Sequence, residues 1–180
     1  MTVMIEVHDL VKKFGDFCAV DHISLTVQEG KIFGFLGPNG AGKTTTIKML
    51  TTVLNPTSGT VRVDGHDPLR EQLQVRRSFG IVFQDPSLDD ELTARENMEL
   101  HGVLYGIASA ERRERIERLL AFVELWDRRN DYVKRYSGGM KRRLEVARAL
   151  LHKPKLLFLD EPTLASTRRR EIIFGALSKV

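Results

Sequence analysis

The residues best suited to chemistry stand at positions 37–44, which read Gly-Pro-Asn-Gly-Ala-Gly-Lys-Thr. They fit the phosphate-binding pattern GxxxxGK[ST]. Glycines let the backbone turn where side chains would clash, so backbone N–H groups can wrap an anion. The Lys43 ammonium can reach the β- and γ-phosphates, and the Thr44 hydroxyl can ligate Mg²⁺. The predicted nucleotide site comprises Gly37, Pro38, Asn39, Gly40, Ala41, Gly42, Lys43, Thr44 and Thr45.

A second candidate site follows the apolar run 156–159, where Asp160 and Glu161 stand side by side. Such a run is typical of a central strand in a parallel sheet, buried on both faces. At its carboxyl end, Asp160 would approach Mg²⁺ at the phosphate loop. Glu161 would lie near the γ-phosphate, where a carboxylate can polarise an attacking water. Two acids after a core strand also suit an ordinary surface loop, but the phosphate loop in the same chain favours the catalytic interpretation.

The third candidate is Ser137-Gly138-Gly139, at the predicted start of a helix. Serine is a favoured N-cap residue, and the two glycines would expose backbone N–H groups at the positive helix end. This arrangement predicts a second anion site. The tripeptide is common in ordinary loops, so its position after the phosphate loop and before the acid pair carries the argument.

Apolar patterns predict the elements that must position these sites. Thr93 and Glu96 form a possible capping box. Ile116, Leu119, Leu120 and Val123 share one helical face, which we expect to pack on its own subdomain, with a partner-binding groove as the alternative. Strands are predicted at 3–7, 23–27, 31–36, 60–64, 79–83 and 155–159, and helices within 44–54, 93–125 and 138–152. Strands therefore flank a helical insertion, which indicates an α/β fold.

The composition limits the classes of protein to which the chain can belong. The chain has 180 residues, 42% of them hydrophobic, which suits one domain with a sizeable core. Its net charge of +4 is too small to argue for nucleic acid binding. Cys18 is the only cysteine, so an internal disulfide is excluded and a reducing cytosol is favoured. No apolar stretch reaches the ~18 residues of a bilayer span, and we expect any membrane role to come through a partner.

Taken together, the motifs resemble those of the ATP-binding cassette (ABC) ATPases. The resemblance runs from Val3 to about Thr163 and rests on 37–44, Gln84, Ser137–Met140 and Leu156–Thr163, in the family's order and spacing. The chain is most similar to the ATPase subunits of daunorubicin-resistance-type multidrug exporters. The resemblance implies an α/β P-loop NTPase fold with a RecA-like core, an N-terminal antiparallel β subdomain and a helical insertion.

This likeness also implies an organisation and a ligand. One domain would span 1–180, with the core and β subdomain in 1–86 and 144–180 and the signature-bearing helical subdomain in 87–143. The ligands would be ATP and Mg²⁺. Two copies would pair head to tail, so that each ATP lies between the phosphate loop of one and Ser137, Gly138 and Gly139 of the other.

Further roles follow from the resemblance alone. Phe14 would stack on adenine, although neighbouring Phe17 competes for this role and Phe14 could be plain core. Gln84 would touch Mg²⁺ and the attacking water. The implied catalytic set is Lys43, Gln84 and Glu161, and the implied metal set is Thr44, Gln84 and Asp160.

By resemblance, the chain is the ATP-hydrolysing subunit of a membrane transporter, for drug or lipid export, that energises a separate membrane-spanning permease from the cytoplasmic face of the membrane. Two alternatives remain. One is a truncated, hydrolysis-deficient nucleotide-binding fragment. The other is a soluble ABC ATPase acting on ribosomes or DNA, which the single cassette and the short gap between 43 and 137 disfavour. We expect no direct contact with nucleic acid.

The sequence departs from the family pattern in three places. Met140 stands where glutamine is usual, on the helix after the phosphate-contacting residues. Residues 165–168 read Ala-Ser-Thr-Arg where the family continues Gly-Leu-Asp-Pro, so the interface aspartate is absent. The final strands and the switch histidine are expected to be missing, and residues 171–180 are predicted to form a short amphipathic helix. From these departures we expect ATP binding with impaired hydrolysis.

Overall fold

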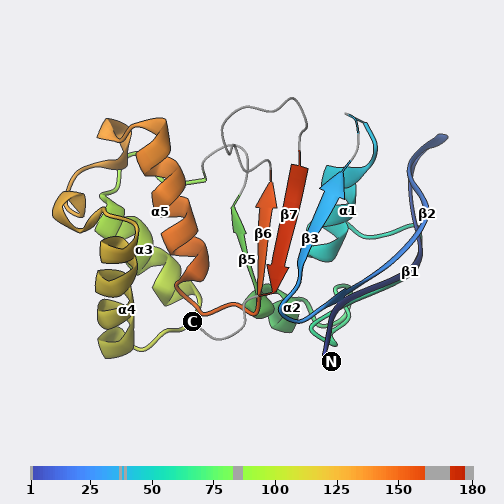
Figure 1. The fold of residues 1–180 in the computed structure, drawn as a ribbon, viewed down its shortest axis with the longest axis horizontal. Helices are drawn as coiled ribbons and strands as arrows, with labels where there is room; N and C mark the ends of the chain where they lie inside the picture. The colour runs from blue at the N-terminus through green and yellow to red at the C-terminus, as the bar shows by residue number, and fades with distance from the viewer. Residues whose placement is uncertain (1, 37, 39, 83–86, 161–170, 177–180) are drawn as a thin grey trace. The chain divides into compact units, whose positions relative to one another are not determined.

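The computed structural model describes residues 2–36, 38, 40–82, 87–160 and 171–176 (Figure 1). The chain forms two compact units. One comprises Met1–Ile81 with Lys155–Val180, and the other comprises Val82–Pro154. From the sequence, the helical subdomain was expected to end at residue 143. In the structure the second unit continues to Pro154, so it also includes residues 144–154.

The first unit begins with an antiparallel sheet of three strands in the order β2-β1-β4. Its strands are β1 (Val3–Phe14), β2 (Phe17–Gln28) and β4 (Ser58–Val63). The predicted antiparallel β subdomain is therefore present, but its first two strands are longer than 3–7 and 23–27. Pairing continues past a register shift between Val7 and Leu10 and ends at Phe14 opposite Phe17. The extra length of β1 and β2 was not predicted, because polar residues interrupt the alternation of apolar residues there.

A second sheet of the same unit has the order β3-β7-β6-β5. It consists of β3 (Ile32–Leu36), β7 (Glu171–Ala176), β6 (Leu156–Asp160) and β5 (Phe79–Val82). Because β7 runs antiparallel to both β3 and β6, the latter two point the same way (Figure 1). The expectation of a central β6 is correct, but one of its neighbours is antiparallel rather than parallel.

The predicted helix at 171–180 is wrong for its described part, because residues 171–176 form β7. The apolar residues in this stretch fit either period, since short apolar runs do not separate helix from strand. Ile172, Ile173 and Phe174 are β-branched or aromatic, which favours a strand. Pairing on both sides also satisfies the backbone N–H and C=O groups of the segment.

One apolar core holds this unit together. Helix α1 (Lys43–Leu50) contributes Ile47, Met49 and Leu50, and α2 (Gln72–Ser78) contributes Val75. The β1–β2–β4 sheet contributes Met4, Ile5, Val7, Leu10, Val20, Val27, Val61 and Val63, and the second sheet contributes Phe79, Leu156 and Phe158. The Phe79 and Phe158 rings meet edge to face with centroids 5.3 Å apart. This shared core fixes β3 and α1, which flank the phosphate loop.

The second unit is helical, as predicted. It contains α3 (Ala94–Leu104), α4 (Ser109–Phe122), the short 3₁₀ turns Trp126–Arg128 and Val133–Arg135, and α5 (Gly138–Leu150). The capping box is confirmed, because Thr93 and Glu96 exchange side chain–backbone hydrogen bonds of 3.1 and 2.8 Å. The apolar face of α4 packs into this unit's own core through Ile116, Leu120 and Val123. None of the described helices is long and apolar enough to span a bilayer.

Candidate nucleotide site

The phosphate loop has the backbone that its glycines predict. Gly40 and Gly42 have φ angles of 85° and 78°, in the left-handed region that favours glycine. A Cβ atom on Gly42 would lie 2.3 Å from the backbone oxygen of Ala19 on β2, so position 42 excludes any side chain. Gly42 also caps α1, whose first N–H groups have no partner within the helix. The loop thus brings bare backbone donors to the positive end of a helix.

Lys43 lies inside this loop rather than in solvent. Its side chain is buried, and its ammonium donates a hydrogen bond of 2.8 Å to the carbonyl oxygen of Pro38 at the other side of the loop. Thr46 is also occupied, since its hydroxyl donates to the Gly42 carbonyl at 2.9 Å. Thr44 is exposed in the first turn of α1, and Thr45 is half-buried. Among these three threonines, Thr44 presents its hydroxyl most openly, as a metal ligand must.

Two aromatic residues stand at the tip of the β1–β2 hairpin, close to the loop. Phe14 and Phe17 face each other across the hairpin and are 50% and 64% exposed. The alternative that Phe14 is plain core is therefore wrong. Ala19, which touches Gly42, is two residues beyond Phe17. The Lys12 ammonium lies 5.1 Å from the centre of the Phe14 ring. Either ring can offer a face to a nucleotide base, and the adenine role stays a prediction.

Strand β6 leads toward the same edge of the sheet as β3. Leu36, the last residue of β3, pairs with Glu171 of β7, and Asp160, the last residue of β6, pairs with Ile172. Since strands lie about 4.8 Å apart, the two strand ends are separated by roughly 10 Å. Glu161, Gln84, Gly37 and Asn39 lie outside the described residues, so the predicted roles of these four residues stay predictions.

The second predicted anion site belongs to the helical unit. Ser137 caps α5, and its hydroxyl accepts a hydrogen bond of 3.3 Å from the Met140 N–H, as predicted. Gly138 and Gly139 are exposed, and apart from their chain neighbours and their own helix backbone no atom lies within 4 Å of the place where a Cβ would stand. Tyr136 anchors the preceding turn, because its hydroxyl donates to the Arg128 carbonyl at 2.8 Å. Burial raises the pKa of the Tyr136 phenol, so that hydroxyl stays a donor.

Sequence reasoning missed a set of buried polar residues on the helical unit. Glu145 on α5 is only 1% exposed, and it accepts a hydrogen bond of 2.8 Å from the Ser87 N–H. Arg148, one turn further along α5, donates to the Ser87 carbonyl at 2.7 Å. One feature of the sequence could have indicated these residues: Glu145 is the only acidic residue of α5, and it stands next to the core residue Leu144.

The resemblance implies that the segment 85–99 faces the membrane partner, where its acidic side chains could meet basic loops. Most of the described acids have partners inside their own unit. Asp90 pairs with Lys141 at 2.7 Å, and Glu91 pairs with Lys134 at 2.7 Å. Glu99 pairs with Arg112, and Glu96 belongs to the capping box. These charges are balanced locally, which weakens the case for an acidic docking face.

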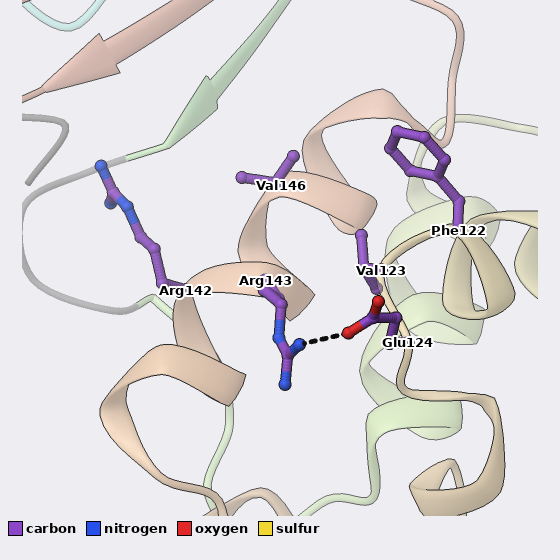
Figure 2. A pocket seen from close by; sticks show the side chains of 6 residues that line it. All are labelled: Phe122, Val123, Glu124, Arg142, Arg143 and Val146. Atoms are coloured by element: carbon purple, nitrogen blue, oxygen red, sulfur yellow. Dashed lines mark hydrogen bonds and ion pairs between the residues drawn. The ribbon is translucent and has the colours of Figure 1, made fainter. Parts of the chain in front are cut away.

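A cavity of about 350 Å³ lies elsewhere on the helical unit, between the end of α4 and α5 (Figure 2). Phe122 at its rim is 75% exposed, and the Glu124–Arg143 ion pair of 3.0 Å crosses it. Its lining comprises Phe122, Val123, Glu124, Arg142, Arg143 and Val146. No predicted site residue lines it, so it is separate from the candidate anion sites.

The phosphate loop suits a nucleotide with its metal. A loop that admits no side chain at Gly42, a lysine turned into it and an open threonine hydroxyl are the donor set that a Mg-bound triphosphate requires. Thr44 would be the chain's hard oxygen ligand for Mg²⁺ among the described side chains of the loop.

Comparisons with known proteins give matches over most of the chain. Residues 20–164 match the family model described as ABC transporter. The chain is 48% identical over 162 residues to the daunorubicin/doxorubicin resistance ATP-binding protein of Streptomyces peucetius, covering 90% of this chain and 49% of that protein. It is 44% identical over 163 residues to a Nod factor export ATP-binding protein of Cupriavidus metallidurans, covering 91% and 54%. The chain thus spans about half the length of these curated relatives.

A solved structure shares the fold. It is the dimeric structure of a post-hydrolysis state of an ATP-binding cassette bound to ADP and Pi, with a TM-score of 0.76 and 31% sequence identity. The match covers 92% of this chain and 77% of that one. Fold and sequence therefore point to the same group of proteins.

Proposed function

Because the chain belongs to the ABC transporter family of ATP-binding proteins, we propose that it binds and hydrolyses Mg-ATP to energise a separate membrane-spanning subunit. The family is established by the match over residues 20–164 and by relatives nearly half identical to this chain. Hydrolysis, the transported substrate and the partners belong to the whole protein and form the proposal. The substrate would be an exported drug or lipid, and the similarity to a daunorubicin/doxorubicin resistance protein supports a drug.

The observation that carries the proposal is the close approach of Gly42 to Ala19. It leaves a bare backbone loop at the start of α1 with the Lys43 ammonium inside it. Lys43 would exchange the Pro38 carbonyl for the β- and γ-phosphate oxygens, which are better acceptors because they are charged. The N–H groups of Gly40, Ala41 and Gly42 would bind the phosphates from the other side.

The remaining residues would complete the reaction site. Phe14 would stack on adenine. Thr44, Gln84 and Asp160 would hold Mg²⁺, which neutralises phosphate charge when bound. Gln84 would also orient the attacking water, and Glu161 would accept its proton. Phosphoryl transfer depends mainly on such positioning and charge stabilisation.

Completion of the site by a second copy is part of the proposal. Ser137, Gly138 and Gly139 would contact the γ-phosphate held by the phosphate loop of the partner, in a head-to-tail homodimer. Their exposure and the open space around both glycines support this role. The pair would act on the cytoplasmic face of the membrane, against a permease on another chain and without nucleic acid.

One sequence feature favours a second candidate, nucleotide binding without turnover. Residues 165–168 read Ala-Ser-Thr-Arg where the family carries the interface aspartate, through either a replaced loop or a loss of four residues. Lys43 and the loop would then still bind ATP, whereas the dimer would lack a contact that aligns Glu161. This candidate shares the binding site with the first and differs only in turnover.

The test is to measure ATP affinity and phosphate release for the chain and for Lys43→Ala, Lys48→Ala and Glu161→Gln. Loss of a charge-assisted hydrogen bond costs about 1.5–3 kcal/mol, so Lys43→Ala should weaken ATP binding by roughly 10-fold or more. Lys48 is exposed on the same helix and is the matched control, with unchanged affinity expected. Glu161→Gln should keep ATP binding and abolish phosphate release.

The outcomes separate the candidates. Equal affinities for Lys43→Ala and Lys48→Ala would overturn the nucleotide site itself. Tight ATP binding without phosphate release, in the chain as in Glu161→Gln, would leave the non-hydrolysing candidate.

A further inference from the structure

The tip of the β1–β2 hairpin contains a lysine that contacts one of the two exposed aromatic rings. Lys12 and Phe14 stand two residues apart at the end of β1. The Lys12 ammonium lies over the Phe14 ring, 5.1 Å from its centre, which is within the range of a cation–π contact. Phe14 is nevertheless 50% exposed. The lysine therefore covers part of the ring, and the rest of the ring stays open to solvent.

The same ammonium group is held from a second side. It donates a hydrogen bond of 2.7 Å to the carbonyl oxygen of Asn55, which lies 43 residues further along the chain. A hydrogen bond with a charged donor is about twice as strong as a neutral one. A lysine side chain that is free in solvent samples many rotamers. The bond to Asn55 restricts Lys12 to conformations that keep its charge over the Phe14 ring.

Asn55 belongs to the segment that follows α1, and this segment is bound on both sides. The Val53 N–H donates to the Lys48 carbonyl of α1 at 2.8 Å. Two residues beyond Asn55, the Thr57 N–H donates to the Val11 carbonyl of β1 at 2.8 Å. The segment therefore connects the end of α1 to the end of β1.

Helix α1 in turn connects these contacts to the phosphate loop. Gly42 caps the first turn of α1, and its close approach to Ala19 places β2 against the loop. Lys12 acts beyond the other end of the same helix, through Asn55. All of these residues belong to one compact unit. The hairpin tip is thus fixed near both ends of α1, which suits a ligand with two separated parts, such as the phosphates and the base of a nucleotide.

We propose that Lys12 is a positioning residue for the nucleotide base. It holds the Phe14 ring in place relative to the phosphate loop and covers one face of the ring, so that the base stacks on the other. A group that is fixed before its ligand arrives loses less conformational freedom on binding, which raises the affinity. The cation also offsets the negative potential of the ring face, which favours contact with the π face of a purine. The inference rests on the proposed function, and in particular on the stacking of Phe14 on the base.

The test compares two ligands in the presence of Mg²⁺: ATP, and inorganic tripolyphosphate, which has the phosphates but no base. Lys12→Met keeps most of the length of the side chain and removes its charge. It should weaken ATP binding by roughly threefold, as the loss of an exposed cation–π contact predicts, and leave tripolyphosphate binding unchanged. Lys12→Arg keeps a cation over the ring and should restore most of the ATP affinity. Thermal unfolding of each variant detects a loss of folding.

A neighbouring lysine provides the matched control. Lys13 has an exposed side chain, and its backbone N–H keeps its bond to the Thr57 hydroxyl when the side chain is changed. Lys13→Met should therefore leave both dissociation constants unchanged. Residues that act through one another show non-additive effects. In a Phe14→Ala chain, Lys12→Met should have no further effect on ATP affinity, because the ring through which it acts is gone.

The two ligands separate positioning from simple charge attraction. Equal weakening of ATP and tripolyphosphate binding in Lys12→Met would mean that the lysine attracts the phosphates, and this would overturn the inference. Unchanged ATP affinity in Lys12→Met, the same loss in Lys13→Met, or a full effect of Lys12→Met in the Phe14→Ala chain would overturn it as well.

The same measurements distinguish this inference from the proposed function. Unchanged ATP affinity in Phe14→Ala would overturn the inference together with the stacking role of Phe14. The nucleotide site would still stand in that case if Lys43→Ala weakens the binding of both ligands. Equal affinities for Lys43→Ala and the unchanged chain would instead overturn the proposed function itself.

Discussion

At the scale of single residues, Gly42 is the position where chemistry and backbone geometry coincide. Its φ of 78° and the Ala19 oxygen, 2.3 Å from where a Cβ would stand, leave no room for any side chain. A left-handed conformation costs a non-glycine residue about 1–2 kcal/mol before any clash. The backbone must therefore shift if a methyl group is added here.

We expect Gly42→Ala to lose ATP affinity by more than tenfold and to lower the unfolding midpoint. The control is Gly139→Ala, because Gly139 has open space at its Cβ position and an ordinary helical conformation. Gly139→Ala should preserve ATP affinity in the single chain. Calorimetric titration and thermal unfolding check both variants, and a Gly42→Ala chain with normal affinity would contradict the loop geometry described above.

At the scale of elements, the contact between α3 and the end of α5 contains a partly buried histidine. His101 packs near Tyr105, His152 and Arg148, with ring centroids 4.6 Å from Tyr105 and 5.7 Å from His152. Burial, followed by the charges of Arg148 and His152, lowers the pKa of His101 from 6.5 to about 3. The folded unit therefore keeps this ring neutral at pH values where the unfolded chain binds a proton.

The sign of the pH dependence follows. As the pH falls below 6.5, His101 binds a proton in the unfolded chain, whereas in the folded chain it stays neutral down to about pH 3. The free energy of unfolding therefore decreases as the pH is lowered from 6.5 to about 3. The slope from this group approaches about 1.4 kcal/mol per pH unit. Trp126 is the only tryptophan and packs in the same helical core, so its fluorescence reports this unfolding. His101→Leu should flatten the slope, exposed His8→Gln should not, and equal slopes in all three chains would contradict this account.

The elements also show what sequence can predict. The glycine turn before α1, the Ser137 cap, the Thr93 capping box and the apolar face of α4 depend on local spacing, and the structure contains all four. Strand β7 depends on pairing with strands far away in the chain, so its short apolar run was ambiguous. Glu145 and Arg148 depend on a partner 58 and 61 residues away, which no local pattern reveals.

At the scale of the whole molecule, two units with separate cores share one chain. The phosphate loop belongs to one unit, and Trp126 belongs to the other. A ligand at 100 times its dissociation constant stabilises the part that binds it by about 2.7 kcal/mol. In the single chain, Mg-ATP should therefore raise the unfolding midpoint of the loop-bearing unit.

Urea titration followed by backbone circular dichroism and by Trp126 fluorescence tests this division. Mg-ATP should shift the transition of the loop-bearing unit and leave the fluorescence transition of the helical unit in place. Lys43→Ala should remove the shift. Equal shifts in both signals would mean that the units unfold as one.

Strand β7 lies between two strands that point the same way, and it is antiparallel to both. Withdrawing it would open a gap of about 10 Å, bordered on each side by unpaired backbone N–H and C=O groups. A gap of that width accepts one extended peptide. The sheet can therefore accept one strand at this position. Residues 171–176 of the same chain occupy it, and the same residues of another copy could occupy it by domain swapping.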